Sequence, residues 1–258
     1  MNIDNFEKSQ GHWILAKMGK RVLRPGGKEL TLKMIHALNI NSNDVVAEFA
    51  PGLGFTTTIT LQKKPKSYFA IEQNEEAVNL LKKKFNSNNV KILNGNASHT
   101  TLQNDSINKV YGEAMLTMHA DHRKSEIIKE AFRILKSGGL YAIHELALTP
   151  DLIDDNVKTE IQKELALAIK VNARPLTEKE WILILENEGF TIKKIYNNSM
   201  TLLELSRIID DEGLFRTIKI AFNVITQPKA RKRIYEMRRI FRKYQNNMNA
   251  ITVIAQKP

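Results

Sequence analysis

The sequence contains no cysteine among its 258 residues. This absence excludes disulfide bonds, metal sites with thiolate ligands and a cysteine nucleophile. The chain also lacks any run of eighteen apolar residues, so we expect no membrane span. Residues 1–7 show no basic segment followed by an apolar one. We therefore expect no signal peptide and a cytoplasmic protein.

Acidic residues are fewer than basic ones, 28 against 39, and the formal net charge is +11. Such an excess is typical of proteins that bind nucleic acid or anionic membranes. The charge is concentrated in residues 229–243, where eight basic residues and one acid, Glu236, supply +7. Ile234, Met237 and Phe241 recur there at intervals of three and four, which predicts an amphipathic helix. Its cationic face is interpreted as solvated surface, with RNA backbone, anionic lipid or an acidic substrate as alternative partners.

Short apolar runs alternate with amphipathic helices from about residue 44, which indicates βαβ units and a mostly parallel sheet. The expected strands are residues 45–49, 67–72, 90–93, 109–112, 140–144, 190–196 and 250–255. Gly138 and Gly139 are expected to end the helix before the fifth strand. We predict an α/β domain over residues 41–258, a Rossmann-like doubly wound sheet of seven strands. Helical inserts at about 150–176 and 200–246 would form a cap at its ligand-binding edge.

Residues 1–40 precede this pattern and are predicted to form a helical lid. They carry His12, Trp13 and Arg24, and a Pro-Gly-Gly break at 25–27 would serve as a hinge. The alternative is a helix that packs Trp13 on the core and leaves its charges in solvent. The lid interpretation makes His12 and Trp13 substrate contacts.

A turn with two glycines follows the first expected strand: Glu48-Phe49-Ala50-Pro51-Gly52-Leu53-Gly54. Gly52 and Gly54 let the backbone approach a ligand closely, although an ordinary tight turn has the same composition. The dinucleotide pattern G-x-G-x-x-G needs a third glycine where Thr57 stands, so a ligand without phosphates is favoured. Glu72 ends the second strand, where a carboxylate can accept both hydroxyls of a ribose.

These motifs resemble those of class I S-adenosylmethionine (AdoMet)-dependent methyltransferases over roughly residues 43–190. In the glycine turn, Ala50 stands in place of the family's first glycine. The other matches are Gly95-Asn96-Ala97, Tyr111-Gly112-Glu113-Ala114, and residues 133–139 before the fifth strand. The pattern is nearest to the small-molecule group that includes the ubiquinone and menaquinone methyltransferases.

The resemblance implies AdoMet as the cofactor and one group of residues that binds it. This group comprises Glu48, Ala50, Gly52, Gly54, Glu72, Gln73, Asn96, Ala97 and Glu113. Within it, Glu72 is expected to bind the ribose. Asn96 is expected to accept a hydrogen bond from the adenine amino group through its amide oxygen.

The resemblance also implies an SN2 transfer in which the protein mainly positions the acceptor in line. A general base is needed only when the acceptor atom carries a proton of high pKa. The candidates are Glu113, His119, His144 and Glu145; a buried, hydrogen-bonded histidine and a capping glutamate are the alternatives for the last two. The expected substrate contacts are His12, Trp13, Met115, His119 and His144. No metal site is expected.

The leading functional hypothesis is methyl transfer to a small molecule held under the helical cap. The alternative is an RNA methyltransferase that acts on ribose or a tRNA base and uses the basic helix 229–243. Amino-group methylators of bases resemble one another in an Asp/Asn-Pro-Pro-aromatic motif, which residues 111–114 lack, and cytosine-C5 methylators need a cysteine. A non-catalytic AdoMet-binding protein and a nicotinamide oxidoreductase are further alternatives. The acceptor atom and the oligomeric state stay open.

Overall fold

One mixed sheet organises the chain, and its strands follow the order β3-β2-β1-β4-β5-β8-β7. The computed structural model describes residues 6–258. The strands are β1 Val45–Phe49, β2 Ser67–Glu72, β3 Val90–Asn94, β4 Ile107–Glu113, β5 Leu135–Leu148, β6 Leu176–Thr177, β7 Thr191–Ser199 and β8 Met248–Gln256. Strands β1 to β5 are parallel, whereas β8 pairs antiparallel with β5 and β7. The strand order reverses between β1 and β4, which is where open α/β sheets bind ligands.

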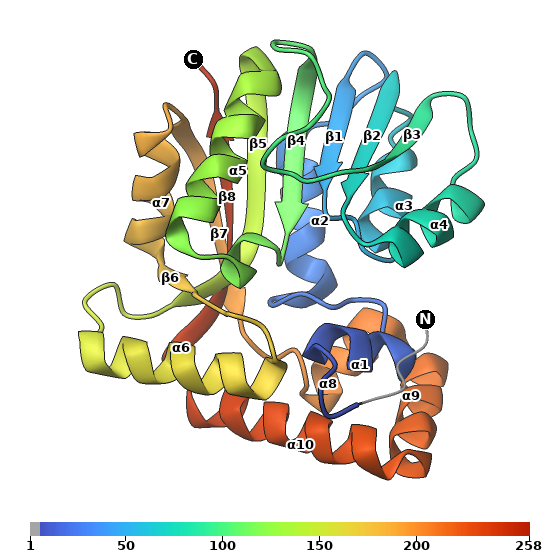
Figure 1. Cartoon of the computed structure of the whole chain (residues 1–258), viewed down its shortest axis with the longest axis vertical. Coiled ribbons are helices and arrows are strands. Elements are labelled where there is room, and N and C mark those ends of the chain that lie inside the picture. The colour runs from blue at the N-terminus through green and yellow to red at the C-terminus, as the bar shows by residue number, and fades with distance from the viewer. Residues whose placement is uncertain (1–5) are drawn as a thin grey trace.

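The helices cover both faces of the sheet and its lower edge (Figure 1). They are α1 Gly11–Lys17, α2 Gly27–Leu38, α3 Phe55–Leu61, α4 Glu75–Lys84, the 3-10 turn η1 Leu116–Met118, α5 Asp121–Ile134, α6 Asp155–Ile169, α7 Glu178–Asn187, α8 Leu205–Glu212, α9 Leu214–Thr226 and α10 Pro228–Lys243. Buried apolar residues of α2 and α4 pack on one sheet face, and those of α5 and α7 pack on the other. The predicted doubly wound α/β class is therefore confirmed.

A separate helical layer, made of α1, α6, α8, α9 and α10, lies across the edge where the parallel strands end (Figure 1). Its apolar core includes Ile14, Leu165 and Met237, which come from α1, α6 and α10. Leu146 and Leu148 of β5 belong to the same core and join the layer to the sheet. No helix within residues 6–258 is both long and apolar enough to cross a membrane.

Several predicted boundaries are wrong. The sheet has eight strands, and the additional one is β6, whose two residues pair with β5. No apolar run in the sequence indicates so short a strand. Helix α5 ends at Ile134, and Gly138–Gly139 lie inside β5, where the pairing with β4 shifts register between Ile107 and Lys109. Strand β5 continues to Leu148 because its antiparallel partner β8 extends equally far.

The helical inserts also differ in detail from the prediction. The segment 200–245 is broken at Gly213 and Gln227 into three helices. Helix α7 begins with a capping box, since Thr177 and Glu180 each accept a hydrogen bond from the other's backbone N–H. Helix α2 packs its buried residues Met34 and Leu38 against the sheet. We therefore restrict the proposed lid to residues before Arg24; its first residues, 1–5, lie outside the described part of the chain.

Candidate active site

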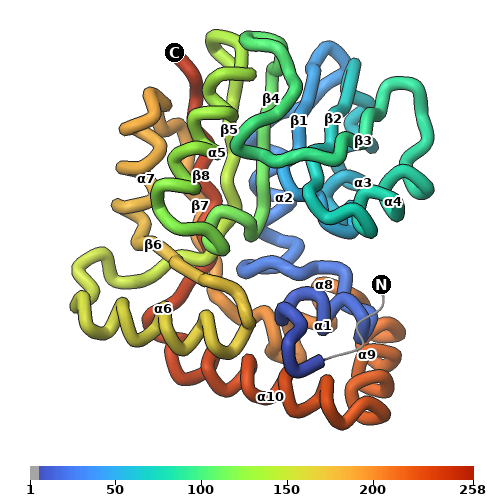
Figure 2. Tube along the Cα trace, viewed as in Figure 1, coloured from blue at the N-terminus to red at the C-terminus, as the bar shows by residue number. Residues whose placement is uncertain are grey.

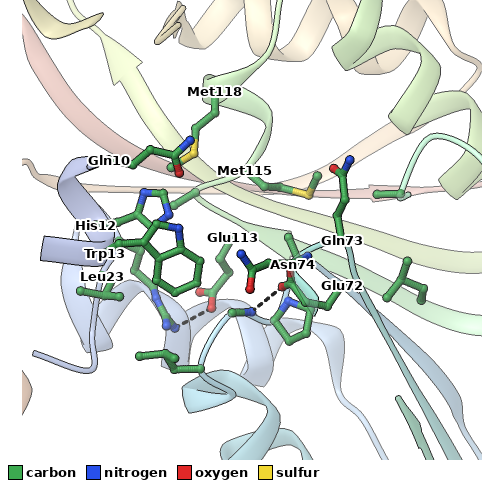
Figure 3. A pocket seen from close by; sticks show the side chains of 18 of the residues that line it. Gln10, His12, Trp13, Leu23, Glu72, Gln73, Asn74, Glu113, Met115 and Met118 are labelled. Atoms are coloured by element: carbon green, nitrogen blue, oxygen red, sulfur yellow. Dashed lines mark hydrogen bonds and ion pairs between the residues drawn. The ribbon is translucent and has the colours of Figure 1, made fainter. Parts of the chain in front are cut away.

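A cavity of about 540 Å³ opens between the ends of the central strands and the N-terminal segment. The loop after β1, the ends of β2 and β4, and α1 form its wall (Figure 3). The predicted residues that line it are His12, Trp13, Ala50, Gly52, Glu72, Gln73, Asn96, Ala97, Glu113, Met115 and His119. The predicted residues that do not line it are Glu48, Gly54, His144 and Glu145.

The loop after β1 holds its two glycines for different reasons. Gly52 has φ +56°, and a Cβ built on it would meet nothing within 4 Å, so its backbone faces open space. Gly54 has φ +70°, but its Cβ would lie 2.6 Å from Phe85 and 2.7 Å from Leu81. Gly54 therefore serves the packing of the loop on α4. Ala50, where the resemblance expects glycine, also has a positive φ of +52°.

Glu72 stands at the end of β2 and faces this loop. Its Oε2 accepts a hydrogen bond from the Gly52 N–H at 3.0 Å, and its Oε1 accepts one from the Asn74 N–H at 2.8 Å. These two bonds hold the carboxylate at the cavity wall, with further acceptor capacity on both oxygens.

Asn96 lines the same end of the cavity with its oxygen already engaged. Its Oδ1 accepts hydrogen bonds from the Ser98 N–H and the Ser98 hydroxyl, each at 3.0 Å. The predicted contact through this oxygen would compete with these two bonds, which use both of its lone pairs. The amide nitrogen keeps its two donors for a ligand.

Glu48 lies behind the loop instead of in the cavity. Its Oε2 accepts hydrogen bonds from the Thr57 hydroxyl, at 2.6 Å, and from the Tyr68 hydroxyl. Burial raises the pKa of Glu48 to about 7, against the opposing effect of these two bonds. This carboxyl ties α3 to β2 beneath the loop and so acts as a positioning residue.

Glu113 ends β4 at the centre of the site. It accepts hydrogen bonds from Arg24 Nη1 at 2.6 Å, from Thr31 Oγ1 at 2.7 Å and from Thr56. His144 Nδ1 lies 2.7 Å from Glu113 Oε1. Burial alone would raise the pKa of Glu113, but Arg24 and His144 outweigh it and lower the pKa to about 2. The carboxylate is therefore ionised at neutral pH and is a poor proton acceptor.

His144 and Glu145 do not serve as the predicted catalytic pair, because β5 continues past them and buries both completely. His144 Nε2 lies 2.6 Å from the Pro25 carbonyl oxygen, so its ring links Glu113 to the segment before α2. Glu145 accepts the backbone N–H groups of residues 115–117 at 2.8–3.0 Å and thereby fixes η1. Both are positioning residues.

His12 and Trp13 project from α1 and face Glu72, Gln73 and Asn74 across the cavity (Figure 3). Their ring centroids are 4.7 Å apart. Burial lowers the pKa of His12 to about 4, so the imidazole is neutral at neutral pH. The structure thus places these two predicted substrate residues opposite the predicted ribose-binding carboxylate.

Sequence reasoning missed several residues of the wall. They include Gln10, Leu23, Phe55 and Asn74. Asn74 caps α4, its side chain accepting from the Ala77 N–H, and the Asn-Glu-Glu start signal of that helix could have revealed it. Gln10 and Leu23 carry no local signal, because only the docking of the N-terminal segment onto the sheet edge brings them to the cavity.

Comparison with known proteins identifies a methyltransferase domain in the chain. A family model described as a methyltransferase domain matches residues 47–143. An uncharacterized protein of Haemophilus influenzae is 31% identical over 252 residues, which cover 96% of this chain and 98% of that protein. Residues 47–143 therefore form a methyltransferase domain, and the protein is an AdoMet-dependent methyltransferase.

Two further relatives of this methyltransferase show different degrees of likeness. The ribosomal RNA small subunit methyltransferase A of Hydrogenobaculum is 28% identical over 118 residues, covering 43% of this chain and 46% of that enzyme. A phosphoethanolamine N-methyltransferase 2 of Haemonchus contortus, solved with S-adenosyl-L-methionine, shares the fold. The superposition has a TM-score of 0.72 at 14% sequence identity, and it covers 96% of this chain and 57% of the other.

AdoMet is the cofactor of this methyltransferase, and the cavity suits it. The open space over Gly52 and the nearby Glu72 carboxylate offer room and an acceptor for a nucleoside. Among the described residues that line the cavity, the only Lys or Arg side chains are Arg21 and Arg24. Both are ion-paired, with Glu212 and Glu113 respectively, so neither is free to bind a phosphate. Within residues 6–258 no group of three or more histidine or acidic side chains could hold a metal ion.

Proposed function

We propose that this methyltransferase transfers the methyl group of AdoMet to a small, largely apolar molecule held beneath the helical layer. One observation carries the proposal: a second cavity, of about 80 Å³, adjoins the first. The two share His12, Leu23, Ala114 and Met118 in their walls. A molecule seated in the second cavity can therefore present one atom to the first.

The second cavity is built for an apolar group. Its walls come from α1, β5, α6, α10 and the loop at 200–202. Its apolar lining includes Leu15, Leu146, Leu165, Ile169, Met200, Leu202, Met237 and Phe241. Apart from His12 and Thr117, the described residues that line it are apolar or glycine. Three methionines in this wall, Met118, Met200 and Met237, supply flexible side chains that adapt to the shape of a ligand.

For the cofactor, we propose that Glu72 accepts hydrogen bonds from the ribose hydroxyls and that the Asn96 amide nitrogen donates to the adenine ring. Ala97 and Ile71 lie beside them in the wall and give the adenine an apolar surface. Bound AdoMet supplies an electrophilic methyl group on a sulfonium. The protein's own task is then to orient the acceptor and to exclude water.

His12 is the residue that we propose to orient the acceptor. It lines both cavities, and its low pKa keeps the ring neutral, with one nitrogen able to accept a hydrogen bond. A hydroxyl, amine or thiol on the acceptor would donate to that nitrogen. Trp13 lies next to this ring, with the two ring centroids 4.7 Å apart.

Methylation of RNA is a second candidate, favoured by the ribosomal RNA methyltransferase relatives and by the basic segment 229–243. The structure weakens the electrostatic argument. Four of the eight basic residues in that segment are ion-paired within the protein: Arg233, Arg238, Arg242 and Lys243. Fewer of its charges are therefore available for phosphates.

A labelling experiment separates the two candidates. The protein would be incubated with methyl-labelled AdoMet and either a small-molecule extract or total RNA. We expect label in the fraction that organic solvent extracts. Label in acid-precipitable, ribonuclease-sensitive material would overturn the proposal in favour of RNA.

A variant of the second cavity makes the test specific to its wall. Of the two adjoining cavities Met200 lines only the second, and Met200→Gln keeps the side chain's size while adding polar atoms. We expect a higher KM for the labelled acceptor, with unchanged affinity for S-adenosylhomocysteine. An unchanged KM would show that the acceptor does not occupy this cavity.

A further inference from the structure

Helix α9 exposes an apolar face to solvent. Phe215, Ile218, Phe222 and Ile225 recur at intervals of three and four, so they lie along one side of the helix. The Phe215 side chain is 89% exposed, and the other three are each more than half exposed. The opposite side of α9 is buried through Thr217 and Ile220. The exposed side therefore forms a stripe that nothing in the described chain covers.

The position of α9 makes this stripe accessible. The helix forms the outer end of the helical layer, away from the sheet (Figure 2). It packs on α8 and α10, and its polar residue Asn223 donates to the Met18 carbonyl oxygen on the inner side. A contiguous exposed apolar stripe of this kind marks an interaction site.

Cations border the stripe. Lys219 is exposed and lies one turn from both Phe215 and Phe222 on the same helix. Arg231, in the first turn of α10, donates to the Ile225 carbonyl oxygen at 3.3 Å, which places its guanidinium at the end of the stripe. Lys229 and Lys232 are exposed in the same turn. Within residues 6–258 none of these four cations pairs with a carboxylate.

We propose that α9 docks this methyltransferase on an anionic lipid surface, with its aromatic and aliphatic side chains inserted among the acyl chains. An amphipathic helix with Phe and Ile on one side and bordering Lys and Arg is the pattern of interfacial membrane helices. The lysines and Arg231 then meet the lipid headgroups, and the net charge of +11 adds attraction at longer range. This surface is separate from both cavities, since none of its residues lines either of them.

Charge decides against a second copy of the chain as the occupant. A symmetric dimer through this stripe would bring the same surface of both copies together. Lys219 and Arg231 of one copy would then face cations of the other, and the repulsion would oppose association. An anionic surface instead complements the same groups.

Vesicle co-sedimentation of the full chain tests the proposal. Vesicles of phosphatidylcholine alone would be compared with vesicles that also contain phosphatidylglycerol. We expect the protein to pellet with the anionic vesicles and to be released as salt is raised, because salt screens the headgroup attraction. Absence of binding to anionic vesicles, or equal binding to the neutral ones, would overturn the proposal.

Phe215→Ser/Phe222→Ser is the decisive variant. Both side chains are exposed, so thermal unfolding should be unchanged. We expect anionic vesicle binding to weaken at least about ten-fold, from the loss of two inserted aromatic rings. Leu152→Ser is the matched control, since Leu152 is 88% exposed, precedes α6 and belongs to neither α9 nor α10, and should leave binding unchanged. Binding of the double variant to anionic vesicles as tight as that of the wild type would overturn the proposal. A lipid-free dimer that the double variant dissociates would assign the stripe to a second copy instead.

Discussion

Arg24 and Glu113 form an ion pair that ties the N-terminal segment to the end of β4, with 2.6 Å between Arg24 Nη1 and Glu113 Oε2. Their side chains are only 10% and 7% exposed. His144 approaches the same carboxylate and also the Pro25 carbonyl oxygen, so one buried cluster fixes the chain that leads from α1 into α2. The position of His12 over the cavity depends on this anchor.

Arg24→Met should therefore destabilise the fold strongly. It leaves the Glu113 charge buried without its closest cation, a change that typically costs about 3–5 kcal/mol. The free energy of unfolding in urea measures the effect. Lys33→Met is the control, because the Lys33–Glu29 pair is half exposed and its loss should cost less than about 1 kcal/mol. Losses of equal size in the two variants would contradict the assigned role.

The two glycines of the loop after β1 should respond differently to alanine. Each substitution costs about 1–2 kcal/mol, because φ is positive at both positions. Gly54→Ala adds a clash with Phe85 and Leu81 and should lower the melting temperature more than Gly52→Ala. Gly52→Ala puts its methyl group into the open space of the cavity and should weaken S-adenosylhomocysteine binding. Thermal unfolding and calorimetry measure the two effects, and the opposite ranking would refute this division of roles.

Local patterns predicted much of the fold. The predicted bounds of β1 and β2 match the structure, because each depends on residues close together in sequence. The end of β5 could not be predicted in this way. Its last pair joins Leu148 to Met248, so the length of the strand is set by a partner about a hundred residues away.

The site was predictable to a similar degree. Gly52 lies just after β1 and Glu72 is the last residue of β2. Because β1 and β2 are neighbouring parallel strands, the topology alone brings both residues to the same edge of the sheet. Glu48 looked equivalent, but its carboxyl bonds to Tyr68 on the neighbouring strand and leaves the cavity. Likewise His144 and Glu145 are buried because β5 runs on beyond them, and no residue next to them in sequence signals it.

Glu48 should make the stability depend on pH. Its pKa of about 7 in the folded protein lies above the ordinary value of 4.5. The protonated carboxyl therefore favours folding below about pH 4.5, and this contribution is lost as the pH rises through about 7. Its size is at most roughly 3 kcal/mol. Glu48→Gln keeps an acceptor for Thr57 but cannot ionise, so its melting temperature relative to the wild type should rise between about pH 5 and pH 8. A difference that stays constant with pH would contradict this account.

Calorimetric titration with S-adenosylhomocysteine tests the central claim most directly, on the wild type, Glu72→Gln and the control Glu75→Gln. Glu72 faces the cavity, whereas Glu75 is exposed on the first turn of α4. The account predicts one site in the wild type and in Glu75→Gln, and at least about ten-fold weaker binding in Glu72→Gln from lost charge-assisted hydrogen bonds. Equal affinity in a folded Glu72→Gln protein, or no binding by the wild type, would contradict it.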